Sequence, residues 1–492
     1  MAGTRVARYH PAMIRVLSHP VYRRLFSAQV VALLGTGLLT VALSLLAYDL
    51  AGAQAGAVLG TVYAIKMVAY VGLSPVTGAL AERLPRKKVL IGADLIRAVV
   101  ALALPFVDAI WQVYVLIFLL QAASATFTPA FQATIPDILP EEEDYTRALS
   151  LSRLAYDLEN LLSPALAGLL LVVLSYQSLF LGTVAGFLGS ALLVWASPLA
   201  RRALPGEEGG AVARRGFRER LTRGARIYLA TPRLRGLLSF NLAAAAAGAF
   251  VLVNTVVIVR GGDTAAGAAA QGIDRGETGV AVAMAAFGAG SMLAALALPR
   301  LLSKLGDRPV MSAAAGVLAM LTLGYGLRGS FGGQPLPWVA LLGLWAALGV
   351  AYGAVLTPSG RLLRRSSHPE DRQAVFTAQF ALSHACWLVT YPVAGWVGQA
   401  AGLGQAALIL GLLALAGTFA GLRLWPAGDP EVLRHAHPDL PPDHPHLAAP
   451  AGDTASPTAA TAGGAQAPGG AAPVHAHAFV IDDEHHAWPT HG

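Results

Sequence analysis

Long runs of hydrophobic residues recur along this chain, with shorter polar segments between them. A helix needs about 20 apolar residues to cross the hydrocarbon core of a bilayer. Twelve runs approach or exceed that length. They predict membrane-spanning helices over residues 25–48, 56–81, 89–107, 111–131, 148–174, 178–197, 236–259, 279–300, 309–328, 337–357, 375–398 and 403–424. The pattern therefore predicts an all-α membrane protein.

The polar connections between these runs differ in charge. Arginine and lysine gather in the even-numbered connections, whereas the odd-numbered ones contain only Arg260, Arg275 and Arg328. Positively charged loops stay in the cytoplasm. We therefore expect both termini in the cytoplasm and the chain in the inner cell membrane, in contact with lipid.

The longest interior connection divides the runs into six and six. Its second half places apolar residues between arginines at partly helical spacing, which predicts an amphipathic basic helix on the membrane surface. The tail is rich in Pro, Ala and Gly and is predicted to be disordered. The expected parts are an N-terminal cytoplasmic segment (1–24), a six-helix bundle (25–197), a cytoplasmic linker (198–235), a second six-helix bundle (236–425) and the histidine-rich tail (426–492).

Composition supports the membrane assignment. Hydrophobic residues make up 55% of the 492 residues and charged residues only 13%, about half of the share usual in soluble proteins. The net charge of +7 follows from the basic loops and does not indicate nucleic-acid binding. No nucleotide-binding loop or hydrolase signature occurs, so we expect a transporter without a cofactor, not an enzyme, and a monomer.

The segment 78–88, Gly-Ala-Leu-Ala-Glu-Arg-Leu-Pro-Arg-Lys-Lys, follows the second run and resembles the signature of the major facilitator superfamily. It departs from the usual pattern at Glu82, where Asp is common, and at Pro85, where Gly is common. The resemblance implies two six-helix bundles with substrate bound between them. The motif residues expected to act in the conformational change are Gly78, Glu82, Arg83, Arg86 and Lys87.

Further stretches resemble particular branches of that family. Residues 163–168 resemble the Gly/Pro kink of facilitator antiporters, and Arg218–Leu238 resembles the linker of the drug-exporter branch. Residues 357–365 and 378–392, with the histidine-rich end, are similar to nickel-resistance permeases of the NreB type. The arginine that many drug:proton antiporters carry in the fourth helix is absent from 118–122.

Nine of the thirteen histidines lie after residue 430, among several carboxylates. Imidazole and carboxylate are ligands of Ni, Co, Cu and Zn, so the tail is a candidate metal-binding segment. Alternatively, it is a low-complexity tail that binds metals weakly or not at all. The candidate ligands are His435, His437, His444, His446, His475, His477, His485 and His486.

Charged and polar residues inside the predicted spans are candidates for transport and coupling. Charges at that depth are costly and face the bundle interior or pair with one another. Asp94 with Arg97, and Arg153 with Asp157, have the spacing of intrahelical pairs. These charges form either a fixed structural network or, at Lys66, Asp157 and Glu159, a carrier of protons or cations. The eleventh span adds Gln379, His384 and Cys386 as candidate ligands, with packing roles as the alternative.

The main functional hypothesis is efflux of a divalent transition metal, Ni(II) first and Co(II) next, in exchange for protons. The first alternative is a proton-coupled exporter of drugs or siderophore-like organic compounds. The second is a membrane sensor that reports metal to a partner without transporting it. Export as the direction of transport rests on the family resemblance alone.

Overall fold

The described chain is almost entirely helical. The computed structural model describes residues 15–73, 85–139, 141, 144, 147–148, 151–152, 155–156, 159, 166–171, 173–199, 217–260, 276–332, 335–368, 371–429, 432–436, 474–482, 485 and 487–489. Within these residues, the strands are two short segments of the tail.

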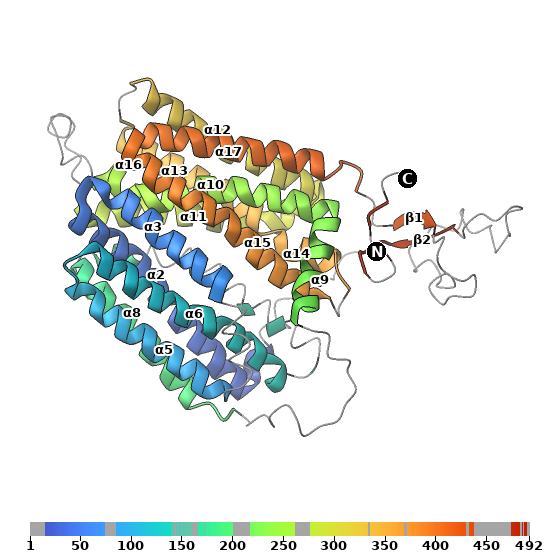
Figure 1. Cartoon of the computed structure of the whole chain (residues 1–492), viewed down its shortest axis with the longest axis horizontal. Helices are drawn as coiled ribbons and strands as arrows, with labels where there is room; N and C mark the ends of the chain where they lie inside the picture. The colour runs from blue at the N-terminus through green and yellow to red at the C-terminus, as the bar shows by residue number, and fades with distance from the viewer. Residues whose placement is uncertain are drawn as a thin grey trace, which may run out of the picture. The chain divides into compact units, whose positions relative to one another are not determined.

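The first half of the chain forms long helices that run side by side (Figure 1). They are α2 (Pro20–Ala51), α3 (Ala55–Val68), α5 (Arg86–Ala103), α6 (Ile110–Ile138) and α8 (Tyr176–Trp195). A short 3-10 turn, Arg15–Ser18, precedes α2, and another, Gly52–Gln54, joins α2 to α3. The α3 helix continues as a π-helical turn, η3 (Ala69–Leu73), and α5 ends in a 3-10 turn, Leu104–Phe106.

The second half repeats this pattern. Its long helices are α10 (Pro232–Arg260), α11 (Gly276–Leu305), α12 (Asp307–Ser330), α13 (Trp338–Leu356), α15 (Arg372–Pro392) and α17 (Leu403–Leu424). Shorter helices are α9 (Phe217–Ala230) before α10, α14 (Ser359–Arg365) before α15, and α16 (Gly398–Ala401) before α17. A second π-helical turn, η6 (Val393–Val397), extends α15 beyond Pro392.

Each predicted span except the fifth corresponds to one of these long helices; the fifth, 148–174, lies largely outside the described residues. Nine stretches of the described chain are long and apolar enough to cross a membrane, and the first of them, Pro20–Leu73, contains both α2 and α3. The α15 helix is not among the nine. It carries Gln379, Ser383 and His384 in its middle, and such a helix is stable in a membrane where its polar face is covered by protein.

The outward surface of these helices is apolar. Phe106, Val99 and Leu192 expose 82%, 67% and 62% of their surfaces. A soluble protein rarely exposes so many large apolar side chains. Lipid is the solvent that suits this surface, as the composition predicts.

Small residues allow the helices to approach closely. A side chain at Gly186 of α8 would come within 3.0 Å of Gly35 of α2, so only glycine fits at this crossing. At the same crossing the Thr183 hydroxyl donates a hydrogen bond to the Gly35 carbonyl at 2.9 Å. Close backbone packing and a buried hydrogen bond together hold the two helices.

The chain divides into two compact units. Unit 1 contains most of the length of the membrane helices: residues 1–214, 240–358 and 380–419. Unit 2 contains residues 215–239, 359–379 and 420–492, so it comprises α9, the first turns of α10 and α15, α14 and the tail.

The linker differs from its prediction in one respect. The basic amphipathic helix is present as α9, but it ends at Ala230, and Arg233 and Arg235 belong to the first turn of α10. Pro232 explains the break, because proline fits the first turn of a new helix and not the interior of a continuing one.

The tail also contains more structure than its composition predicts. Strand β1 (Val432–Ala436) pairs with β2 (Val474–Ala478) in an antiparallel two-stranded sheet. The second segment, Val-His-Ala-His-Ala, alternates apolar with polar residues, which is the pattern of a strand, whereas the first, Val-Leu-Arg-His-Ala, does not. Overall composition hides such a short local pattern.

Candidate functional site

A charged pair lies at the end of α3. The Lys66 ammonium is 5.6 Å from the centre of the Tyr70 ring, and it interacts electrostatically with Glu159 of the fifth predicted span. Glu159 is also within electrostatic range of Tyr70 and Tyr156. Lys66, Tyr70 and Glu159 are all partly exposed. The arrangement places one cation, one carboxylate and a phenol ring together inside the membrane-spanning part.

Two residues of α15 complete this cluster. The His384 ring centre lies 5.6 Å from that of Tyr70, in an edge-on arrangement, and 3.9 Å from that of Phe380. The Phe380 ring centre is 5.9 Å from Tyr70. The His384 Nδ1 atom is 2.7 Å from the Phe380 carbonyl oxygen, which fixes the orientation of the imidazole. We call Lys66, Tyr70, Glu159, Phe380 and His384 the charged cluster.

Aromatic rings continue from helix to helix in the same unit. Tyr63 of α3 stacks on Tyr391 of α15 with 4.8 Å between ring centres, and Tyr391 lies 4.9 Å from Trp387. Trp387 is 6.3 Å from Tyr352 of α13, which is 5.3 Å from Phe287 of α11. We call these five residues the aromatic band. It joins helices of both halves of the chain.

Irregular helix geometry accompanies both groups. Tyr70 lies in the π-helical turn η3, and the turn η6 begins directly after Pro392, next to Tyr391. A π-turn inserts one residue per turn, and such turns occur often at functional sites. In α3 and α15 the extra residue of each π-turn shifts the helical register of the side chains that follow it.

Beyond the aromatic band, the two halves touch at the C-terminal ends of α2 and α10. The Arg260 guanidinium forms an ion pair with Asp49 at 3.1 Å and lies over the Tyr48 ring at 4.5 Å. The Tyr48 hydroxyl donates a hydrogen bond to the Arg260 carbonyl at 2.7 Å. These contacts close one end of the interface between the halves.

The neighbouring crossing of α3 and η6 is equally close. A side chain at Gly60 would lie 2.7 Å from the Tyr391 carbonyl oxygen, so only glycine fits there. The Asn254 side chain donates a hydrogen bond to the Ala394 carbonyl at 3.1 Å. An amide that joins two helices in this way acts in helix packing.

The predicted pairing of Asp94 with Arg97 is confirmed. Their side chains form a buried ion pair within α5, and the Ser190 hydroxyl donates to the second Asp94 oxygen at 2.7 Å. The Arg97 guanidinium lies over the rings of Phe127 and Phe187, at 4.4 and 4.6 Å. The pair is enclosed by partners and has a structural role.

The structure does not bring all candidates of the eleventh span together. Cys386 contacts the Leu382 carbonyl at 3.6 Å and does not belong to the charged cluster. Gln379 belongs to unit 2, where its side chain accepts a hydrogen bond from the Tyr228 hydroxyl of α9. His384 is thus the candidate of this helix that contacts Tyr70, the ring beside Lys66.

Other predicted residues are described in part. Asp157, Gly78, Glu82 and Arg83 lie outside the described residues. Arg86 begins α5, and the Lys87 ammonium donates to the Ser197 carbonyl at 2.9 Å.

The tail histidines are described unevenly. His435 pairs with His475 across the two strands, and His477 is opposite Leu433. His485 is buried and contacts Asp482. Among the described residues, no group of three or more His, Cys, Asp or Glu has the geometry of a metal site. His437, His444, His446 and His486 lie outside the described residues.

Sequence reasoning missed the aromatic residues, although their spacing contained a signal. Phe380, His384, Trp387 and Tyr391 are four, three and four residues apart, which places them on one face of a helix. Tyr63 and Tyr70 flank Lys66 at a similar spacing. Aromatic residues on one face of a helix are also typical of ordinary packing. Only the contacts between aromatic residues of different helices identify the site.

Comparison with known proteins agrees with the fold. The family model described as Major Facilitator Superfamily matches residues 25–273. A mutant of the nucleoside transporter NupG superposes with a TM-score of 0.62 at 16% identity, covering 82% of this chain and 100% of that one. A POT family transporter in complex with a thioalcohol-conjugated peptide gives a TM-score of 0.60 at 11% identity, covering 81% of this chain and 94% of that one.

Curated relatives match by sequence over shorter stretches. An uncharacterized MFS-type transporter, YfiS of Bacillus subtilis, is 30% identical over 126 residues, 26% of this chain and 30% of that protein. Macrolide efflux protein A of Streptococcus pyogenes is 28% identical over 35% of this chain and 42% of its own length. Multidrug resistance protein MdtG of Citrobacter koseri is 27% identical over 36% of this chain and 44% of its own length.

The chain therefore aligns with less than half the length of these curated relatives. The family model, in contrast, covers residues of both halves, and the helical architecture agrees with it. On these grounds the chain is a multi-pass membrane transporter that belongs to the Major Facilitator Superfamily.

Proposed function

We propose that this protein exports amphipathic organic compounds across the cell membrane in exchange for protons. The observation that carries the proposal is the charged cluster beside the aromatic band, both within unit 1. Rings from four helices offer flat apolar surfaces, while Lys66 and Glu159 supply the few polar groups that orient a ligand. The names of the relatives, macrolide efflux and multidrug resistance, support organic compounds over metal ions as the exported class.

The cluster suits a compound that carries both an aromatic group and a positive charge. The Lys66 ammonium lies beside the Tyr70 ring and close to Glu159. An ammonium group on a substrate would find the same two partners, a ring face and a carboxylate. We therefore propose that the substrate cation takes the place of Lys66 next to Glu159.

This exchange offers a route for coupling. The Glu159 carboxyl group either carries a proton or, as a carboxylate, attracts a cation. A proton and a substrate cation therefore cannot occupy Glu159 at the same time. Binding of protons on one side of the membrane would release the substrate there. Glu159 would thereby couple transport to protons, a role that related antiporters assign to an arginine in the fourth helix. This chain lacks that arginine.

The contacts between the halves support a particular state. Asp49, Tyr48 and Arg260 close the end of the interface at the C-termini of α2 and α10. From the arginine distribution we propose that those ends face the outside and that both chain termini lie in the cytoplasm. The structure would then be the state closed to the outside, in which an exporter takes up substrate from the cytoplasm as a monomer.

Dye efflux tests the proposal directly. Cells that express the protein are loaded with ethidium, a neutral dye or an anionic dye, and the initial rate of efflux is compared with cells that lack it. We expect faster efflux of ethidium, and loss of that gain with Glu159→Gln. Asp108→Asn is the matched control, because Asp108 is an exposed carboxylate in the turn before α6. Equal efflux with and without the protein, for every dye, would refute the proposal.

Export of Ni(II) or Co(II) is the second candidate. One observation favours it: the strand register places His435 directly opposite His475, with His477 two residues further along the same strand. Histidine is a ligand that suits a borderline metal ion. Metal content of expressing cells, with and without residues 430–492, tests it. Lower nickel or cobalt that depends on the tail would support metal export, and unchanged content would exclude it.

A further inference from the structure

Residues near the end of the tail pack against the helical part of unit 2, although the sequence predicts a disordered tail. Phe479, Ile481 and His485 expose 3%, 0% and 4% of their surfaces. They stand out from the Ala, Pro and Gly that dominate the tail. Burial to this degree indicates a specific binding site, here called the seat, for the described residues of the segment 479–488, which are 479–482, 485, 487 and 488.

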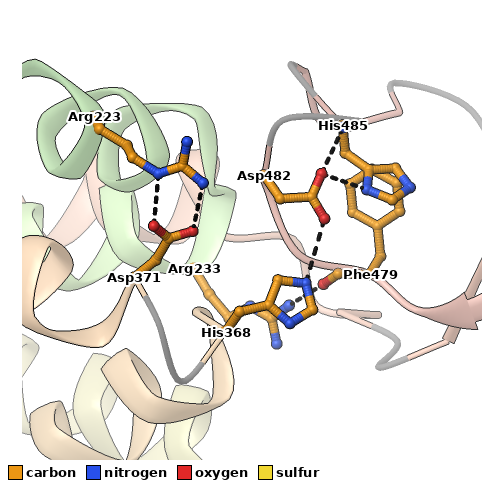
Figure 2. A network of polar contacts seen from close by, with 7 residues as sticks. All are labelled: Arg223, Arg233, His368, Asp371, Phe479, Asp482 and His485. Atoms are coloured by element: carbon orange, nitrogen blue, oxygen red, sulfur yellow. Dashed lines mark hydrogen bonds and ion pairs between the residues drawn. The ribbon is translucent and has the colours of Figure 1, made fainter. Parts of the chain in front are cut away.

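Asp482 is the polar centre of that seat (Figure 2). One carboxylate oxygen is 3.3 Å from Nε2 of His368, which lies in the turn between α14 and α15. The other oxygen accepts hydrogen bonds from the backbone amide of His485 at 2.7 Å and is 2.9 Å from its Nδ1 atom. Burial opposes the charged form, but the contacts with His368 and His485 outweigh it and hold the pKa of Asp482 well below its ordinary value.

Arg233 forms the second point of attachment. This arginine of the first turn of α10 is 1% exposed. Its guanidinium lies 5.1 Å from the centre of the Trp488 ring and donates to the Phe479 carbonyl at 3.5 Å. The Phe479 ring packs edge-on against Trp488 and His485, with ring centres 5.0 and 4.6 Å apart. The segment therefore folds around Arg233.

The same surface holds the linker helix. Arg223 of α9 forms a two-pronged ion pair with Asp371, directly before α15, at 2.6 and 2.9 Å (Figure 2). Asp429, after α17, accepts from Trp425 at 3.1 Å and from Arg365 of α14 at 3.2 Å. The tail segment thus binds the start of α10 and the turn before α15. Ion pairs of Arg223 with Asp371 and of Arg365 with Asp429 hold α9 and α14 in the same unit.

We propose that residues 479–488 form an intramolecular clamp that slows transport until it opens. A contact present in only one conformation stabilises that conformation against the others. Alternating access moves the helices of the two halves relative to each other, and α9 is part of the segment that joins the halves. The tail segment contacts α10 and the turn before α15, which both belong to the second half. In this proposal the clamp acts by holding these two helices in one arrangement, which delays the change of state to the extent that transport shifts them relative to each other. The inhibitory role rests on the proposed transport function, whereas the seat itself does not.

Two measurements on the full chain test the clamp. Hydrogen exchange followed by mass spectrometry reports whether the amides of residues 474–489 are protected, and the initial rate of ethidium efflux reports transport. We compare the parent with Phe479→Asp, with Asp482→Asn and with a chain that ends at Pro473. Ala487→Asp is the matched control, because Ala487 is exposed within the same segment.

We expect protection in the parent and in the control, and loss of protection in Phe479→Asp. We expect efflux to rise by roughly threefold or more in Phe479→Asp and in the shortened chain, and by less in Asp482→Asn. Rapid exchange of residues 474–489 in the parent would overturn the clamp. Loss of protection with an unchanged or lower efflux rate would overturn its inhibitory role. Absence of efflux from the parent and the shortened chain alike would refute the transport proposal and this role with it.

Discussion

Two acid–base pairs of the first half use the same chemistry but differ in how firmly they are held. Asp94 and Arg97 form a buried ion pair, with Ser190 bonded to the carboxylate and aromatic rings on the guanidinium. Lys66 and Glu159 are partly exposed and approach only to electrostatic range, without a hydrogen bond between them in the described structure. A buried pair whose two charges are bound directly to each other resists change, whereas a pair without a direct hydrogen bond can exchange one partner for a substrate or a proton.

The same contrast separates the two units. In unit 2, Arg223 and Asp371 meet through two hydrogen bonds, and Asp482 has several partners. In unit 1, His384 contacts rings and one carbonyl oxygen. The ion pairs of unit 2 are suited to hold elements together, and the aromatic and polar groups of unit 1 are the kinds of group that bind an organic cation.

The largest effect is expected from Asp94→Asn. The substitution leaves the Arg97 charge buried without its counter-charge, which costs about 3–5 kcal/mol of folding free energy. Thermal unfolding in detergent is expected to show a markedly lower Tm and a lower yield. Ser190→Ala is the milder companion, because it removes a single hydrogen bond worth about 1 kcal/mol. If Asp94→Asn kept the stability of the parent but lost transport, the pair would belong to the site and the contrast would be wrong.

The next largest effect is expected from Glu159→Gln, on transport and not on stability. Glutamine keeps the size of the side chain but cannot carry a negative charge, so both a substrate cation and Lys66 lose their partner. A charged interaction worth about 1.5–3 kcal/mol corresponds to a loss of at least about tenfold in the ethidium efflux rate. The Tm should stay close to that of the parent. A large drop in Tm would show that this pair is as structural as Asp94 with Arg97.

A smaller effect is expected at Tyr70, whose ring faces the Lys66 ammonium. Tyr70→Leu removes the aromatic face, which is worth about 0.5–2 kcal/mol to a cation. Tyr70→Phe keeps the face and serves as the control. Apparent KM for ethidium efflux should rise with leucine and change little with phenylalanine. If both variants weakened binding equally, the hydroxyl group and not the ring would be the contact that matters.

The smallest effect is expected from Asp49→Asn at the closed end of the interface. Partly exposed ion pairs contribute about 0–1 kcal/mol, so the balance between conformations should shift by no more than about fivefold. A cysteine introduced at the half-buried Ala51, two residues after Asp49, would report this shift in the parent and in Asp49→Asn through its rate of labelling by a thiol reagent added outside. High salt should reduce the difference between parent and variant. A loss of transport as large as that of Glu159→Gln would instead place Asp49 in the substrate path.

Much of the fold could be predicted from the sequence because a lipid environment leaves few choices. The bilayer requires apolar runs of fixed length and leaves no polar backbone unpaired, so the boundaries of α2, α12 and α17 follow from hydrophobicity within a few residues. Short local patterns were harder to recognise. The break at Pro232 and the strand Val474–Ala478 lie in segments whose overall composition predicts a continuous helix and a disordered tail.

The candidate site could be predicted only in part. Lys66, Glu159 and His384 are recognisable in the sequence as polar residues inside apolar runs. In the structure Lys66 lies near Glu159 and beside Tyr70, and His384 contacts the same Tyr70 ring. Cys386 is recognisable in the same way but points elsewhere, because it is two residues from His384 on the helix. The aromatic residues lie on one face of their helix by spacing alone, but such spacing is equally typical of ordinary packing and does not identify a site.

By itself, the sequence determined that this chain crosses the membrane many times, which family it resembles and which charges lie in its spans, because apolar run length and ionisable side chains are local properties. Only the tertiary structure decided which charges are locked and which are loosely held, that rings from both halves form one band, and that the end of the tail is buried. These features depend on contacts between residues far apart in the chain, and the spacing of residues within one helix does not specify which surface that helix will meet.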